Sequence, residues 1–261
     1  MKEDATIEQK RSYPSPNPQV KLTEILYWSC GFRVKGLLAE PVKLGNYEGI
    51  LYLRGGIQSI GMVRPARIAQ FAAQGFIVFA PYYRGNRGGE GRDEFAGEDR
   101  YDAVNGVDVL KQFLSVDRIH LFAFSRGGIM ALWTAILRND VTSVVTWSGV
   151  SDVILTYEER NDMRRMMKRV IGGNPNNARL AYEDRQPIPR INDITCSLLI
   201  IHGEKDRNVG IEHAIRLEKA LEKEEKVYET MYFKELTHFF EAKINSQIVH
   251  NLTTWMKQQR G

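Results

Sequence analysis

The sequence predicts a single α/β domain, with a mostly parallel central sheet, helices on both faces and a small helical cap insertion. Three observations predict this fold. Short apolar runs alternate with amphipathic segments of helical length along most of the chain, as in parallel sheets with helical crossovers. The length of 261 residues suits one such domain with a sizeable core. The chain shows no internal repeat and no sign of a second domain.

The first half of the chain supplies the beginning of this sheet. Residues 1–20 are polar and rich in proline, and we expect them to form an N-terminal arm before a domain over 21–261. Two runs around Gly31 are typical of an antiparallel strand pair. The expected strands cover 24–30, 32–40, 49–53, 76–80 and 118–124, and the expected helices cover 65–74 and 99–114.

The second half of the chain continues the alternation and contains the insertion. The expected strands cover 142–147, 197–201 and 227–233, and the expected helices cover 126–138, 211–224 and 244–258. Residues 151–190 form the expected cap. Within them, a helix over 157–171 places Met163, Met166, Met167 and Val170 on one apolar face. Met166 is therefore a candidate for an adaptable acyl pocket, although packing onto the sheet is the alternative for this face.

Composition narrows the possible functions. The net charge is +4, but basic and acidic residues are interleaved without a long basic block, so nucleic-acid binding is not expected. The two cysteines lie in or beside apolar runs and do not imply a disulfide. The N-terminus lacks an apolar signal core and no stretch reaches membrane-spanning length. We therefore expect a cytoplasmic protein without membrane contact, and its oligomeric state stays open.

A serine lies between a predicted buried strand and a predicted helix, in the segment Ala123-Phe124-Ser125-Arg126-Gly127-Gly128. A serine in that place lies on a sharp turn, and small residues must flank it because the strand and helix backbones pass close together. Ala123 and Gly127 are those small residues. The helix N-terminus behind the serine favours developing negative charge. Ser125 is therefore the candidate nucleophile, and a simple helix cap is the alternative.

An acid and a histidine follow in the order that a serine-centred triad requires. Asp206 comes after a predicted strand and a turn, and His238 lies in a loop before the last predicted helix. In a triad the acid fixes the imidazole tautomer, and the histidine takes the proton of the serine. The order Ser125, Asp206, His238 is that of α/β-hydrolases, whereas other serine hydrolases order these groups differently.

Two residues compete for these roles. Glu204 is the competing carboxylate, and we favour Asp206 because it follows the turn. His202 is the competing histidine, but it comes directly after a strand and is better placed to shape the loop than to reach the serine. The remaining histidines are predicted inside a strand or on helices.

Two loops at strand ends are expected to complete the site. The backbone N–H of Arg126, directly after the nucleophile, is one candidate oxyanion donor. The glycine-rich run over 53–57 should provide the other, and we favour Gly56 over Ile57. The following glycine-rich loop contains Tyr82 and Tyr83. Both are candidates for lining the substrate pocket, and core packing is an equal alternative. We predict no metal site and no cofactor.

Four segments of the chain, in the right order, resemble the catalytic domain of the prolyl oligopeptidase family. They are RGNRGG at 84–89, SRGG at 125–128, YEDRQPI at 182–188 and IHGEKD at 201–206. The similarity covers roughly residues 25–260. It implies an α/β-hydrolase fold and nucleophilic cleavage of an acyl bond, with Ser125, Asp206 and His238 as the triad. Peptidases of this family usually carry an N-terminal β-propeller, and the residues before the first expected strand are too few to form one.

The sequence therefore predicts a serine hydrolase that cleaves a carboxylic ester or amide through an acyl-enzyme. A small-acyl esterase is the favoured interpretation. A prolyl oligopeptidase-like peptidase acting on short peptides or aminoacyl amides is the main alternative. A non-catalytic binding protein on the same fold is a third, which the intact set of triad residues disfavours. The expected partner is a small ester or a short peptide.

Overall fold

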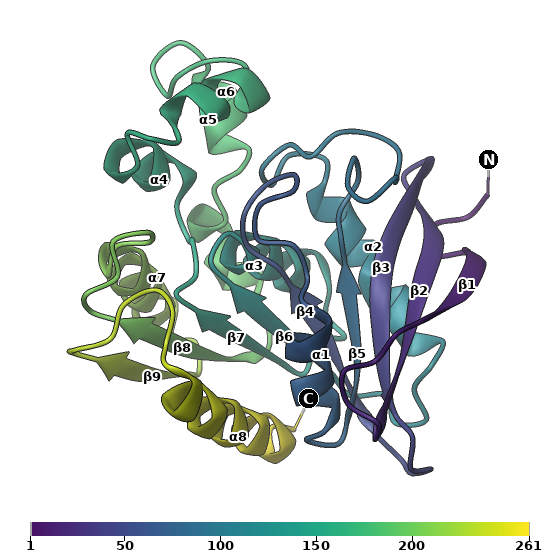
Figure 1. Cartoon of the computed structure of the whole chain (residues 1–261). Coiled ribbons are helices and arrows are strands. Elements are labelled where there is room, and N and C mark those ends of the chain that lie inside the picture. The colour runs from purple at the N-terminus through teal and green to yellow at the C-terminus, as the bar shows by residue number, and fades with distance from the viewer. Residues whose placement is uncertain (1, 261) are drawn as a thin grey trace.

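The computed structural model describes residues 2–260 and contains one sheet of nine strands (Figure 1). The eight expected strands form, with boundaries moved by a few residues. They are β2 (Val20–Ser29), β3 (Phe32–Pro41), β4 (Glu48–Leu53), β5 (Phe76–Pro81), β6 (Ile119–Phe124), β7 (Ser143–Trp147), β8 (Ser197–Gly203) and β9 (Tyr228–Phe233). A ninth strand that was not expected, β1 (Ile7–Tyr13), precedes them.

The strand order in this sheet is β1-β2-β3-β5-β4-β6-β7-β8-β9. The pairs from β5 to β9 are all parallel, and β1, β2, β3 and β5 pair antiparallel. The carboxyl ends of β4, β6, β7 and β8 therefore meet at one edge, which is where ligand sites gather in open α/β sheets. This mostly parallel sheet is the α/β-hydrolase architecture that the sequence predicted.

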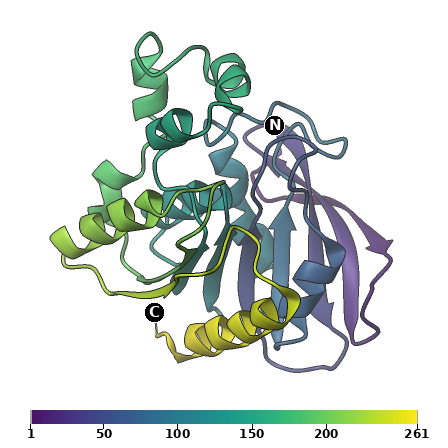
Figure 2. The same ribbon diagram turned by 60° about the vertical axis from the view of Figure 1, so that its left-hand side comes forward.

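Helices cover both faces of the sheet, and each face has its own apolar core (Figures 1 and 2). One face packs under α2 (Arg100–Lys111), α3 (Gly127–Leu137) and α7 (Glu212–Lys223). The other packs under α1 (Pro65–Ala72) and α8 (Ala242–Gln258). Because β4 to β8 are buried on both sides, their sequences are apolar runs without alternation. No helix within residues 2–260 is both long and apolar enough to cross a bilayer.

The N-terminal segment does not form a separate arm, and that expectation is corrected. Residues 7–13 form β1, an edge strand that pairs antiparallel with β2 from Ile7 opposite Tyr27 to Tyr13 opposite Leu22. The strand has no buried residue, because its charged side chains face solvent on both sides. An edge strand needs little apolar character, so composition alone gave no strand signal here.

The insertion between β7 and β8 contains three short helices and a 3-10 turn, in place of the single helix expected over 157–171. These are α4 (Val153–Glu159), α5 (Arg164–Ile171), α6 (Arg179–Glu183) and η1 (Ile188–Asp193). The backbone leaves the helical region at Arg160, with φ −107° and ψ 77°. The guanidinium of Arg160 pairs with the carboxylate of Asp162, with 2.7 Å between Nη2 and Oδ2. Figure 1 shows α4, α5 and α6 standing together beyond the layers that cover the sheet.

Candidate active site

Ser125 lies on a strained turn at the carboxyl end of β6. Its φ of +56° is in the left-handed region, which a residue with a side chain adopts only when its surroundings enforce it. The turn is held by its own backbone, because the carbonyl oxygen of Ser125 accepts from the N–H groups of Gly128 and Val150, both at 2.9 Å. The serine is therefore presented on a fixed turn between strand and helix.

Gly127 explains why this turn needs a small residue. A Cβ at Gly127 would lie 2.1 Å from the carbonyl oxygen of Leu53 in β4. The start of α3 thus runs directly against the neighbouring strand, and any side chain would force the two apart. This close approach is the one expected from the spacing of the small residues around Ser125.

Asp206 and His238 are in direct contact. His238 Nδ1 lies 2.7 Å from Asp206 Oδ2, and both side chains are almost fully buried. Since a carboxylate only accepts, Nδ1 carries the proton and Nε2 is left as the acceptor. The second oxygen of Asp206 accepts from the backbone N–H groups of Asn208 at 2.8 Å and Val209 at 3.0 Å. These bonds fix the carboxylate on the loop after β8.

The charge of Asp206 is maintained by the same contacts. Burial alone would raise the pKa of this carboxyl group, but the hydrogen bond and the charge of His238, with the two backbone donors, lower it below its usual value. Asp206 is therefore ionised at neutral pH. It can stabilise the imidazolium that forms when His238 accepts a proton.

The competing residues occupy other places. Glu204 is exposed, whereas Asp206 contacts the imidazole. His202 is buried, and its Nε2 bonds to the carbonyl oxygen of Val209 at 2.9 Å, so it shapes the acid loop. His120 lies inside β6 between Ser143 and Glu48.

The imidazole of His238 lies against the nucleophile turn. Its ring centroid is 4.8 Å from that of Phe124, the residue before Ser125, and 4.9 Å from that of Phe239. Among residues 2–260 no hydrogen bond joins Ser125 Oγ to His238. Such bonds are often long before substrate binds and tighten in the reacting complex. Phe239 is 65% exposed, whereas His238 itself is only 5% exposed.

The loop after β4 crosses directly over the nucleophile. A Cβ at Gly55 would lie 2.7 Å from Cβ of Ser125, so the peptide between Gly55 and Gly56 is next to the reactive side chain. Gly56 has φ +66°, and a Cβ there would lie 2.2 Å from the carbonyl oxygen of Ile60. Within residues 2–260 the backbone N–H groups of Gly56, Ile57 and Arg126 donate to no protein acceptor. All three remain available to a substrate oxygen, and the choice of Gly56 over Ile57 stays a prediction.

The two tyrosines predicted for the substrate pocket lie in the core instead. Tyr83 is completely buried, and its hydroxyl donates to the carbonyl oxygen of Arg54 at 3.4 Å. Tyr82 is 4% exposed and packs in the core under α1 and α8. Core packing, the equal alternative, is what the structure contains, because both side chains are buried directly after the end of β5. Met166 is half-buried against the core on the side of the cap, and its role in substrate binding stays a prediction.

Sequence reasoning missed a buried group of charges beneath the site. The side chains of Arg54, Asp93, Asp99 and Arg126 are each at most 2% exposed and lie together under the Ser125 turn and the loop after β4. Burial raises the pKa of Asp99 to about 7, and Arg126 opposes that shift. Charged residues in glycine-rich loops usually face solvent, so no sequence signal distinguished these four from surface residues.

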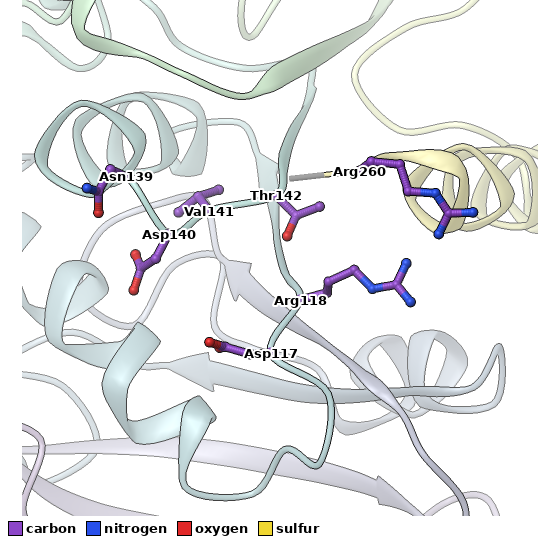
Figure 3. Close-up of a pocket in the computed structure, with 7 residues that line it drawn as sticks. All are labelled: Asp117, Arg118, Asn139, Asp140, Val141, Thr142 and Arg260. Carbon is purple, nitrogen blue, oxygen red and sulfur yellow. The ribbon is translucent and has the colours of Figure 1, made fainter.

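A separate hollow of about 450 Å³ lies at the opposite edge of the sheet (Figure 3). Its lining comes from the segments that precede β6 and β7 and from the C-terminal segment, and consists of Asp117, Arg118, Asn139, Asp140, Val141, Thr142 and Arg260. β6 spans six residues, or roughly 20 Å at the usual rise per residue. The hollow is thus a full strand length from Ser125 and takes no part in the site.

The sheet and the site together define a class of protein. A serine on a left-handed strand-to-helix turn, faced by an imidazole that is bonded to a buried carboxylate, can carry out nucleophilic acyl transfer. On an open, mostly parallel sheet with the strand order given above, this is the arrangement of the α/β-hydrolases.

The family can be stated more closely. Residues 62–261 match the model of the prolyl oligopeptidase family, and the chain belongs to this family of serine hydrolases. An uncharacterized peptidase, YtmA, from Bacillus subtilis (strain 168) is 56% identical over 97% of this chain and 100% of its own length. The resemblance predicted from the four sequence segments is thereby confirmed.

Two solved structures show the same fold at low sequence identity. The acylaminoacyl peptidase of Pyrococcus horikoshii superposes with a TM-score of 0.80 at 17% identity, covering 93% of this chain and 42% of that one. An acetyl xylan esterase from Paenibacillus sp. R4 superposes with a TM-score of 0.76 at 13% identity, covering 98% of this chain and 90% of that one. The chain therefore matches less than half of the peptidase and nearly all of the esterase.

Proposed function

We propose that this protein hydrolyses esters of small carboxylic acids through a covalent acyl-enzyme on Ser125. The observation that carries the proposal is the buried contact between His238 Nδ1 and Asp206 Oδ2 at 2.7 Å, beside a serine on a left-handed turn. That contact leaves Nε2 of His238 as the base for the serine hydroxyl.

The proposed reaction has two acyl-transfer steps. His238 Nε2 takes the proton of Ser125 Oγ as this oxygen attacks the ester carbonyl carbon. The resulting oxyanion accepts from the backbone N–H groups of Arg126 and Gly56. As the tetrahedral intermediate collapses, the imidazolium returns the proton to the leaving alcohol. Water then attacks the acyl-enzyme by the same route, and the carboxylic acid leaves with Ser125 restored.

One observation favours an ester over a peptide as the substrate. The acetyl xylan esterase, whose name identifies an ester substrate, matches this chain over nearly the whole length of both. A peptide bond needs its amine leaving group protonated while the chain is held in register, whereas the better leaving group of an ester makes a smaller demand on the site.

The second candidate function is a peptidase of short peptides or aminoacyl amides. Membership of the prolyl oligopeptidase family supports it, as does the 56% identity to a chain described as an uncharacterized peptidase. The acylaminoacyl peptidase with TM-score 0.80 has the same fold. Under this alternative Ser125, Asp206 and His238 keep their roles, and the leaving group is an amine.

Matched esters and amides distinguish the two functions. We expect p-nitrophenyl acetate and butyrate, and the corresponding alkyl esters, to be cleaved with much higher kcat/KM than the matching anilides and aminoacyl or prolyl anilides. The alkyl esters are the fair comparison, because their leaving groups are not activated as p-nitrophenol is. Ser125→Ala is the blank for every substrate. A kcat/KM on aminoacyl or prolyl anilides that equals or exceeds that on the alkyl esters would establish the peptidase instead.

A further inference from the structure

Asp93 is a buried carboxylate that five donors approach from three parts of the site. Its side chain is 1% exposed and lies in the loop between β5 and α2. Oδ2 accepts from Arg54 Nη2 at 3.4 Å, from the backbone N–H of Gln58 at 3.1 Å and from Asn86 Nδ2 at 3.2 Å. Oδ1 accepts from Arg126 Nη1 and, at 3.5 Å, from the backbone N–H of Phe95.

The loop that carries Gly56 needs such an anchor. Gly56, Gln58 and Gly61 have φ values of +66°, +52° and +68°. Glycine adopts such values freely, but Gln58 carries a side chain and keeps this left-handed conformation only when its surroundings enforce it. The N–H of Gln58 donates to Asp93 only two residues beyond Gly56. The guanidinium of Arg54 donates from beneath to the carbonyl oxygens of Gly55 at 2.9 Å and Ile60 at 3.2 Å.

Asp93 also fixes the second candidate oxyanion donor, the backbone N–H of Arg126, but it does so through the side chain of that residue. Arg126 carries the other candidate oxyanion N–H on its backbone, while its side chain runs under the turn and bonds to Asp93. The guanidinium also lies 3.5 Å from Asp99 and over the ring of Tyr83. Burial would raise the pKa of Asp93, but the charge and hydrogen bond of Arg126, with Gln58 and Arg54, lower it. Asp93 is thus a charged acceptor at neutral pH.

We propose that Asp93 is a positioning residue that sets the two halves of the oxyanion hole relative to each other. One oxygen fixes the loop of Gly56 through Gln58 and Arg54, and the other fixes the turn of Arg126 through its guanidinium. Two peptide N–H groups that must meet one oxygen stabilise it fully only if they are already in place, because moving them during the reaction costs free energy. This inference rests on the proposed function.

The test separates positioning from general stability. We expect Asp93→Asn to lower kcat for p-nitrophenyl acetate by about 10–100-fold, since removing an oxyanion donor outright costs about 10²–10³. KM should stay within about 2-fold, because a ground-state carbonyl uses the hole little. The affinity for a short-chain alkyl trifluoromethyl ketone, whose adduct with Ser125 places an oxyanion in the hole, should fall by the same factor as kcat/KM.

Asp102→Asn is the matched control. Asp102 is a completely buried carboxylate in α2 that pairs with Arg84 at 2.8 Å and accepts from Ser29 at 2.7 Å. Its carboxylate bonds to no residue of the Gly56 loop or of the Ser125 turn. We expect Asp102→Asn to lower the melting temperature about as much as Asp93→Asn does, and to leave the affinity for the ketone unchanged.

Asp93→Glu keeps the test decisive if the asparagine variant does not fold. It retains the charge that faces Arg54 and Arg126 but displaces the acceptor by one methylene, so kcat and ketone affinity should fall together while KM holds. Wild-type kcat and ketone affinity in a folded Asp93 variant, or an equal loss in Asp102→Asn, would overturn the inference. Failure of the proposed function is distinguishable, because it shows in the wild-type protein itself. That protein would then either fail to react with a fluorophosphonate at Ser125 or, as a peptidase, cleave anilides with a kcat/KM equal to or above that for alkyl esters.

Discussion

Asp206→Asn is the substitution that most sharply probes the chemistry of the site. The carboxylate accepts three hydrogen bonds, two from the backbone at 2.8 and 3.0 Å and one from His238 at 2.7 Å. An asparagine can keep the two backbone bonds with its oxygen. Its NH₂ group then faces His238 Nδ1, and two donors cannot share one hydrogen bond. The imidazole must present a lone pair at Nδ1, which moves its proton to Nε2.

The size of the expected loss in kcat follows from that change of tautomer. With the proton on Nε2, His238 cannot accept the hydrogen of Ser125, and the charge that would stabilise the imidazolium is lost as well. The same exchange in the Ser-His-Asp triad of a well-known serine protease lowers kcat by about 10⁴, or about 5 kcal/mol of transition-state stabilisation. Since the backbone bonds of Asp206 survive the exchange, we expect that loss with little change in melting temperature.

The assay is kcat for p-nitrophenyl acetate in purified Asp206→Asn and Glu204→Gln, with thermal melts of both. Glu204 is exposed, so its substitution should change kcat by less than about 2-fold, as for an ordinary surface position. Comparable losses at the two positions would remove support for Asp206 as the acid. A larger loss at Glu204 would refute the reasoning.

Three further predictions follow from the described contacts. Ser125→Ala should lower kcat by about 10³-fold or more while KM and the melting temperature change little; residual turnover near the wild-type rate would contradict this. Gly127→Ala should destabilise the fold by about 1–3 kcal/mol through overpacking and lower activity, because the new Cβ would lie 2.1 Å from the Leu53 carbonyl oxygen. Gly31→Ala has no atom within 4 Å of the new Cβ, but its φ of +79° costs an alanine some stability; it should nevertheless keep full activity, and equal activity loss would refute the packing argument. Burial lowers the pKa of His213 from 6.5 to about 4, so the unfolded chain takes up the proton first. Folding stability should then fall by up to about 3 kcal/mol as pH drops from 6.5 towards 4. Denaturant unfolding of His213→Asn across this range should show a smaller fall, and an unchanged pH dependence would contradict the assignment.

The elements of the fold were predictable where one physical signal dominated. β4, β6, β7 and β8 are buried on both sides, and their apolar runs stand out between polar helices. β1 was not recognised because an edge strand keeps its backbone bonds while its side chains face water. The helix predicted over 157–171 was too long. The apolar spacing from Met163 to Val170 lies within α5 and its cap, and it gives no sign of the break in the helix at Arg160.

The residues of the candidate site were likewise predictable only where one chemical requirement singled them out. The order of Ser125, Asp206 and His238 singled out these residues, because the chemistry of acyl transfer requires those groups; Asp206 and His238 are in contact, and the role of the three as a triad stays a prediction. Tyr82 and Tyr83 were misplaced, since a tyrosine after a strand is compatible with either a pocket or a core. Asp93 gave no signal at all, because its importance depends on donors from Arg54, Gln58 and Arg126, which only the folded chain brings to one point.

The central claim is that Ser125 is a nucleophile activated by His238. Incubation of the purified protein with a fluorophosphonate, followed by peptide mass spectrometry, tests it most directly, because this reagent forms a covalent adduct with an activated serine hydroxyl. We expect one adduct on the peptide that contains Ser125, together with loss of esterase activity, and no adduct in Ser125→Ala. Absence of an adduct on the folded wild-type protein, or an adduct on a different serine, would contradict the claim.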